Sequence, residues 1–261
     1  IVLVTGVQTC ALPILHRLTK YITRHGEINM NEINVDDKEL TNKLLIKWLD
    51  KLAYLSDIKR RSIYNMASNY YNNTSFLLKI NTAIVNEEKY CSDNDVVSSV
   101  IYEKENDKHI LSYNDEKMEF TYIQIKEIIS GMIDLLEKIH PLGTVVQLKN
   151  QFLKNIIADN KIENARFVII NRFMFHNEIK TYFQYAGVVY PLGMVGDGKA
   201  IQFTTELIEK VIHEGYSDEQ EEAYVYLLKK ELVIEKKMHS FGFSTKDERE
   251  DFEMKTEVES K

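Results

Sequence analysis

The chain has 261 residues, with 33 Lys and Arg against 40 Asp and Glu, which gives a formal net charge of −7. This length accommodates one large or two small domains. An acidic chain with scattered lysines argues against nucleic acid as a partner, because phosphate contacts require a basic face. Since a membrane-spanning helix needs about 20 apolar residues and no run reaches that length, we also expect no membrane insertion.

Residues 4–14, VTGVQTCALPI, resemble the in-frame translation of a short-read sequencing adapter. They lack the basic start and the small-residue exit of a signal peptide, and their glycines are too few for a dinucleotide-binding pattern. Residues 26–30 can be back-translated as a ribosome-binding site followed by a start codon at Met30. We therefore expect residues 1–29 to be an artefact or translated leader.

Removing residues 1–29 changes both the charge and the cysteine content. This segment has a net charge of +2, so the remaining residues have −9; its charged residues are Arg17, Lys20, Arg24 and Glu27. Cys91 becomes the single cysteine and cannot form an internal disulfide. A reducing compartment, and hence a cytoplasmic location, is the simpler interpretation.

Residues 30–139 are expected to form an α+β domain. A capping pattern at Asp36 begins an amphipathic helix that runs to about Leu55, with an extension to Met66 left open. A second amphipathic helix is predicted over residues 125–139, where the following proline disfavours helical backbone. Between the helices, polar turns separate three short predicted strands, at residues 75–85, 96–102 and 109–113.

Residues 140–216 are expected to form a β-rich domain, a small bent antiparallel barrel-like structure with many glycines. Its five strands are predicted at residues 144–148, 166–173, 181–190, 200–204 and 210–213. A capping pattern at Ser217–Gln220 begins a C-terminal helix, residues 217–243. The charged residues 244–261 are predicted to be a disordered acidic tail. The fold class is therefore α+β.

Five sequence pieces follow one another in this β-rich region. They are PLGTVVQLK at 141–149, FVIINR at 167–172, YAGVVYPLGMVG at 185–196, Phe203, and IEKVIHEGY at 208–216. In this order they resemble the domain of unknown function family 4176, over about residues 139–226. The resemblance implies a Gram-positive type VII secretion locus, beside LXG-type toxins and small helical secretion proteins. A targeting or chaperone-like role follows by association with that locus alone.

The motif residues are also the candidates for a binding surface. The glycines are expected to permit tight turns or close approach of strands. The tyrosines could be exposed binding anchors, but filling the core is the favoured interpretation. The candidates are Gly143, Tyr185, Gly187, Tyr190, Pro191, Gly193, Gly196, Phe203, Gly215 and Tyr216.

No catalytic residue, cofactor or metal site is expected. Residues 193–200, GMVGDGKA, approach a phosphate-binding loop, but Ala200 stands where a hydroxyl must ligate Mg²⁺, and Asp197–Gly198 is better explained as a hairpin turn. The five histidines after Met30 lack metal-ligand spacing. No nucleophile motif or isolated carboxylate pair indicates an enzyme.

Two functions follow as hypotheses. The first is a non-catalytic cytoplasmic adaptor or chaperone-like protein that binds the helical N-terminal region of a type VII secreted effector. The second is an immunity protein that binds and neutralises a toxin domain, for which the acidic charge would suit a basic nuclease. An enzyme has no support from individual residues. In both hypotheses the partner is a protein.

Overall fold

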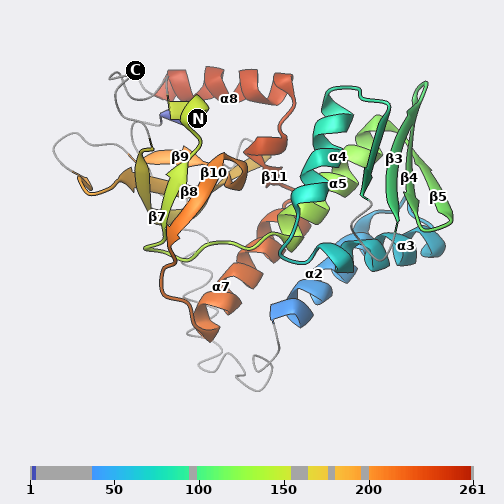
Figure 1. Cartoon of the computed structure of the whole chain (residues 1–261), viewed down its shortest axis with the longest axis horizontal. Coiled ribbons are helices and arrows are strands. Elements are labelled where there is room, and N and C mark those ends of the chain that lie inside the picture. Colours follow the sequence, from blue (N-terminus) through green and yellow to red (C-terminus); the bar gives the residue numbers. More distant parts are fainter. Residues whose placement is uncertain are drawn as a thin grey trace. The chain divides into compact units, whose positions relative to one another are not determined.

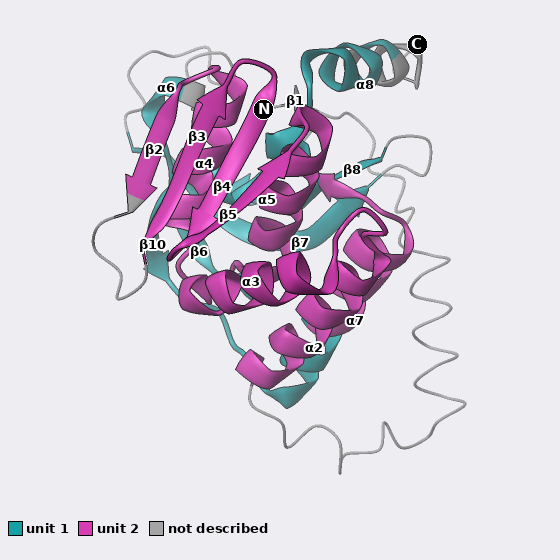
Figure 2. Cartoon of the chain, turned by 90° about the vertical axis from the view of Figure 1, so that its right-hand side faces the viewer, with its two compact units in different colours: residues 1–34, 139–225, 240–261 teal, residues 35–138, 226–239 magenta. Residues whose placement is uncertain are grey.

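A computed structural model of the chain shows two compact units (Figures 1 and 2). Unit 1 comprises residues 1–34, 139–225 and 240–261, and unit 2 comprises residues 35–138 and 226–239. The residues that the structure describes are 2–3, 37–93, 99–153, 164–175, 180–194 and 200–259. Each unit contains an antiparallel sheet and helices, so the expected α+β class is confirmed.

The helices of unit 2 differ from the predicted ones in two places. The helix predicted from Asp36 ends at Lys51, and the extension towards Met66 that was left open is a separate helix, which begins where the Ser56 hydroxyl accepts a hydrogen bond from Lys59 N at 3.3 Å. The strand predicted over residues 75–85 is wrong, and this segment is helical. Its buried apolar residues recur at helical spacing; they are Phe76, Leu77, Ile80, Ala83 and Ile84. The helical segments are α2 (Asp37–Lys51), α3 (Asp57–Ala67), η2 (Ser68–Tyr70), α4 (Ser75–Val85) and α5 (Tyr122–Leu136).

The sheet of unit 2 has the order β2-β3-β4-β5, with all neighbours antiparallel (Figure 2). Its strands are β2 (Tyr90–Asp93), β3 (Val100–Glu105), β4 (Lys108–Tyr113) and β5 (Glu116–Phe120). Asn106 and Asn114 adopt left-handed φ values of 53° in the two hairpin turns, a conformation that asparagine tolerates well. The β5 strand was not predicted, because only Met118 and Phe120 supply its apolar alternation.

Helix α5 is the centre of unit 2. Thr121 and Gln124 form a capping box at its first turn, and its apolar residues are buried almost throughout. At Gly131 an added Cβ would lie 2.3 Å from a ring carbon of Trp48 in α2. Glycine at this position therefore allows the indole to lie directly on the helix backbone.

The sheet of unit 1 is antiparallel and open. Its order is β1-β9-β8-β7-β6-β10, so among the described strands β1 and β10 are edges and no closed barrel forms. The strands are β1 (Val2–Leu3), β6 (Val145–Leu148), β7 (Arg166–Phe175), β8 (Thr181–Val189), β9 (Ile201–Phe203), β10 (Ile208–His213) and β11 (His239–Ser240), which pairs with β8. The register shifts between Ile169 and Asn171, which is a bulge in β7. A bulge bends its strand locally, so this register shift is a local source of the bend expected for this sheet.

Residues 246–259 form helix α8, where a disordered tail was predicted from Ser244. Phe252 is only 1% exposed, and its ring centroid lies 5.6 Å from that of Phe183 in β8 and 5.0 Å from that of Phe241. The burial of Phe252 therefore fixes a helix that is otherwise mostly polar. The other helical segments of unit 1 are α6 (Asn150–Leu153), η3 (Thr205–Leu207), η5 (Phe241–Phe243) and α8 (Lys246–Glu259). Helix α7 (Glu219–Lys229) lies mostly in unit 1, and the π-helix η4 (Lys230–Glu235) lies in unit 2.

Helix α7 begins with a cap from Asp218, whose Oδ1 accepts hydrogen bonds from Gln220 N and Glu221 N at 3.0 Å each. The helix continues from unit 1 into the first residues of the unit 2 segment 226–239. Within the described part of the chain, no helix has both the length and the apolar character needed to cross a membrane.

Candidate binding surface and pocket

Several predicted motif residues form the framework of unit 1. Tyr185 is fully buried in β8, its hydroxyl accepts a hydrogen bond from His140 N at 3.1 Å, and its ring lies 5.4 Å from that of Phe203. At Gly187 an added Cβ would lie 2.9 Å from Val168 O. Tyr185, Gly187 and Phe203 therefore fill the core and allow close strand approach.

The loop after Pro141 is joined to the end of β10 by a set of short contacts. Gly143 has a φ of 82° and donates its N–H to Ile169 O at 2.9 Å. Thr144 Oγ1 donates to Pro141 O at 2.7 Å and accepts from Gly215 N at 3.0 Å. At Gly215 an added Cβ would lie 2.1 Å from Leu142 O, so only glycine fits.

This joint is bordered by exposed apolar side chains. Tyr216 is 81% exposed, Leu142 is 49% exposed and Ile170 is 42% exposed. Leu142 precedes Gly143 and Ile170 follows Ile169, and Gly143 N donates to Ile169 O. Tyr216 follows Gly215 in the sequence. We call Leu142, Ile170 and Tyr216 the closure surface, since each is an exposed apolar residue next in sequence to a residue of this joint.

A second exposed group follows β8. Gly193 has a φ of 67° and donates its N–H to Val189 O at 2.8 Å, which closes a turn containing the cis Tyr190–Pro191 peptide bond. Tyr190, Leu192 and Met194 are exposed there. Gly196 and the hairpin turn predicted at Asp197–Gly198 lie outside the described residues.

The sequence-based candidates did not include a buried ion pair between β7 and α7. Both terminal nitrogens of Arg172 donate to the two carboxylate oxygens of Glu221, and one of these bonds is 2.9 Å. The Arg172 guanidinium carbon lies 5.1 Å from the centre of the Tyr224 ring. Burial lowers the pKa of Arg172, and the nearby tyrosines partly oppose this shift. The sequence signal that could have indicated this ion pair is an arginine within the apolar run FVIINR.

His140 and Glu214 form a second polar contact of unit 1 that the sequence did not indicate. His140 Nδ1 lies 3.1 Å from Glu214 Oε1, and the imidazole ring centroid lies 6.0 Å from that of Tyr185. This contact joins the residue that precedes the Pro141 loop to the residue that precedes Gly215. It therefore supports the same joint as the Thr144 hydrogen bonds.

Glu206 in η3 carries a buried carboxylate. Within the described part of the chain, no hydrogen bond of good geometry reaches either carboxylate oxygen, although Thr204, Lys149 and Arg249 lie near enough to favour the charged form. Burial is the larger effect and raises the pKa of Glu206. An added Cβ at Gly242 would lie 2.7 Å from Oε2, so the carboxylate packs directly against η5.

The shift at Glu206 predicts a pH-dependent stability. Below pH 4.5, the ordinary pKa, the group is protonated whether the chain is folded or unfolded. As pH rises further the unfolded chain ionises first, so stability falls until pH passes the raised pKa. Glu206→Gln should remove this fall and stabilise unit 1 by about 1–3 kcal/mol at pH 8. Urea unfolding at pH 5 and pH 8 measures it. The exposed Glu209→Gln is the control, and an equal gain there would contradict the assignment.

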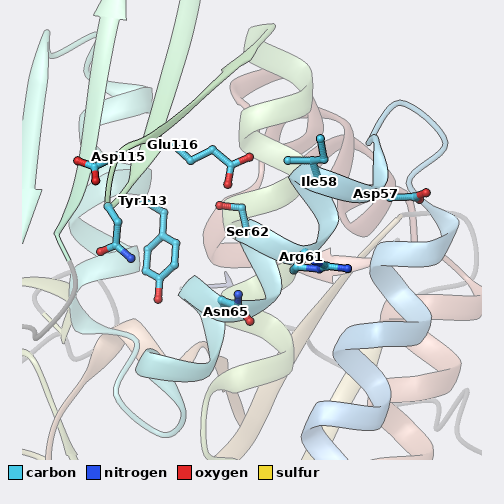
Figure 3. A pocket seen from close by; sticks show the side chains of 9 residues that line it. Asp57, Ile58, Arg61, Ser62, Asn65, Tyr113, Asp115 and Glu116 are labelled. Atoms are coloured by element: carbon cyan, nitrogen blue, oxygen red, sulfur yellow. The ribbon is translucent and has the colours of Figure 1, made fainter.

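Unit 2 contains a pocket between α3 and the turn that joins β4 to β5 (Figure 3). Its volume is about 540 Å³. Polar and charged side chains predominate in its lining, with Ile58 as the apolar exception. The lining residues are Asp57, Ile58, Arg61, Ser62, Asn65, Tyr113, Asn114, Asp115 and Glu116. The sequence did not indicate it, because the two walls are about 50 residues apart in the chain.

Among the described residues, no cluster of His, Cys, Asp and Glu side chains has the composition of a metal site. Cys91 forms no disulfide with a described residue, and its exposure is intermediate. The structure thus offers two kinds of surface. One is the apolar closure surface of unit 1, and the other is the polar pocket of unit 2.

The chain is thus an α+β protein of two units, and its glycine and tyrosine motifs all lie in unit 1. Residues 139–224 match the family model of the domain of unknown function DUF4176, which confirms the resemblance seen in the sequence. No curated protein and no solved structure matches the chain.

Proposed function

We propose that this chain is a non-catalytic cytoplasmic adaptor or chaperone-like protein for a type VII secreted effector of the LXG type. The closure surface binds the helical N-terminal region of that effector. The exposure of Tyr216 and Leu142, on the two loops that meet at Gly215, is the observation that carries this proposal, because exposed aromatic and aliphatic side chains are good anchors for an apolar partner. An amphipathic helix presents such a face at i, i+3 and i+4 spacing.

The framework residues also support a binding role. The Thr144 hydroxyl, which accepts from Gly215 N, and the close packing of Gly215 on the Leu142 backbone hold the two loops of the closure surface together. A surface that is already ordered loses less conformational entropy when it binds. Most of the free energy gained by burying Tyr216 and Leu142 can therefore contribute to affinity.

The second candidate is an immunity protein that neutralises a toxin domain, supported by the net charge of −7. An acidic protein attracts a basic toxin over a distance and raises the association rate. The two candidates differ in the segment of the effector that is bound. Pull-down with the separated helical region and toxin domain distinguishes them, and protection of toxin-expressing cells supports immunity.

Tyr216→Ala is expected to weaken binding of the helical effector region by about tenfold or more, since truncating an anchor residue costs about 2 kcal/mol. Isothermal titration with the effector encoded beside this chain measures the change. Tyr90→Ala is the matched control, because Tyr90 is a 55% exposed tyrosine of unit 2. Equal losses in the two variants, or no complex with the unsubstituted chain, would contradict the proposal.

A further inference from the structure

The pocket of unit 2 has a feature that its structural role does not explain. Ser62 is 4% exposed, and its hydroxyl oxygen has no hydrogen-bond partner among the residues that the structure describes. A buried hydroxyl without a partner costs roughly 1–3 kcal/mol. Figure 3 shows this hydroxyl on the side of α3 that faces the β4–β5 turn, where it lines the pocket. A ligand in the pocket would supply the missing partner.

Charged residues line the pocket on both of its walls, the α3 wall and the β4–β5 turn. Asp115 and Glu116 lie in and beside the β4–β5 turn, and neither side chain forms an ion pair or hydrogen bond within the described residues. Figure 3 shows the Glu116 carboxylate reaching towards α3, whereas the Arg61 side chain extends away from the turn. Asp57 on the helix wall already pairs with Arg60 at 2.9 Å. The turn side of the pocket is therefore acidic and available to a cation.

The remaining lining favours a planar cation. Tyr113 offers an aromatic side chain, and Asn69 Nδ2 donates to its hydroxyl at 3.4 Å, which holds the ring in place. A guanidinium group can stack on such a ring while it donates two parallel hydrogen bonds to a carboxylate. An ammonium group can do neither as well. Ile58, which is 70% exposed, adds apolar contact area to the pocket lining.

We infer that this pocket binds an arginine side chain carried by a peptide segment of a protein partner. The guanidinium pairs with Glu116 and Asp115, stacks on Tyr113, and donates to the Ser62 hydroxyl oxygen. A volume of about 540 Å³ exceeds what one guanidinium fills, so neighbouring peptide atoms enter as well. This site lies outside residues 139–224 and does not depend on the role proposed for the closure surface.

The test uses the full chain, labelled with ¹⁵N, and the peptide acetyl-Ala-Arg-Ala-amide. We expect saturable shift changes at the amides of Ser62, Asn114 and Glu116, with an affinity of about 1 mM, as befits a few contacts. The comparator replaces arginine with citrulline, which has the same shape and no charge. It should bind about tenfold more weakly, because the charge-assisted hydrogen bonds are lost.

Two variants make the result specific to this pocket. Asp115→Asn with Glu116→Gln should weaken the arginine peptide about tenfold, while Glu105→Gln with Asp107→Asn makes the same charge change in the β3–β4 turn and should leave affinity unchanged. Ser62→Ala should lower affinity several-fold while stability is kept or raised. Equal binding of the citrulline peptide, equal losses in both double variants, or no saturable change would overturn the inference.

Discussion

Replacing Lys229 with methionine is expected to lower the free energy of unfolding of unit 2 by about 3–5 kcal/mol. The Lys229 ammonium is buried and donates to Leu135 O at 2.9 Å and to Glu137 O at 2.6 Å. It thereby satisfies carbonyl groups at the end of α5. Asp134 is fully buried and Glu137 is 4% exposed, so both carboxylates would lose their cation.

Urea unfolding followed by circular dichroism measures the effect of Lys229→Met. Lys230→Met is the matched control, because Lys230 is the next residue and its partly exposed side chain pairs with Glu235 at 3.5 Å. The control should change stability by less than about 1 kcal/mol, as is usual for surface ion pairs. A similar loss in both variants would show that helix propensity, rather than the buried ammonium, matters here.

Replacing Arg172 with methionine is expected to destabilise unit 1 by about 2–3 kcal/mol, less than for Lys229 because Glu221 is partly exposed and can be hydrated. Arg172→Lys keeps the charge but loses the two parallel hydrogen bonds, so it should fall between methionine and the unsubstituted chain. Near-ultraviolet circular dichroism should report the change, since Tyr224 lies against the guanidinium.

Arg166→Met provides the control for Arg172, because Arg166 lies in the same strand with an exposed side chain. It should leave unit 1 within about 0.5 kcal/mol of its original stability. Full stability in Arg172→Met would mean that the packing of Tyr224 and Tyr185 suffices without the ion pair.

The local patterns of the sequence predicted the strands of unit 1 well, because β-branched and aromatic runs such as residues 166–173 have no helical alternative of equal quality. The same reasoning was wrong for residues 75–85, where Phe76, Leu77 and Ile80 fit a helix once the β-leaning composition is set aside. It also placed no weight on Phe252, whose burial orders α8.

The polar contacts could not be predicted in the same way. Arg172 and Glu221 are 49 positions apart, and Lys229 and Leu135 are 94 positions apart. Such pairs depend on the tertiary fold rather than on local spacing. For the motif glycines, the sequence predicted a turn or a close approach of strands. It did not predict which atoms come close, such as Leu142 O at Gly215.

The path of α7 has a practical consequence for dividing the chain. The family match ends at residue 224, within a helix that continues to Lys229. A fragment of residues 139–224 would end in mid-helix and would also lack Ser240, whose hydroxyl donates to Gln184 at 3.0 Å, and Phe252. The family match and unit 1 therefore cover different lengths of chain. Expression of the family segment alone should give a protein with an exposed β8 face and a tendency to aggregate.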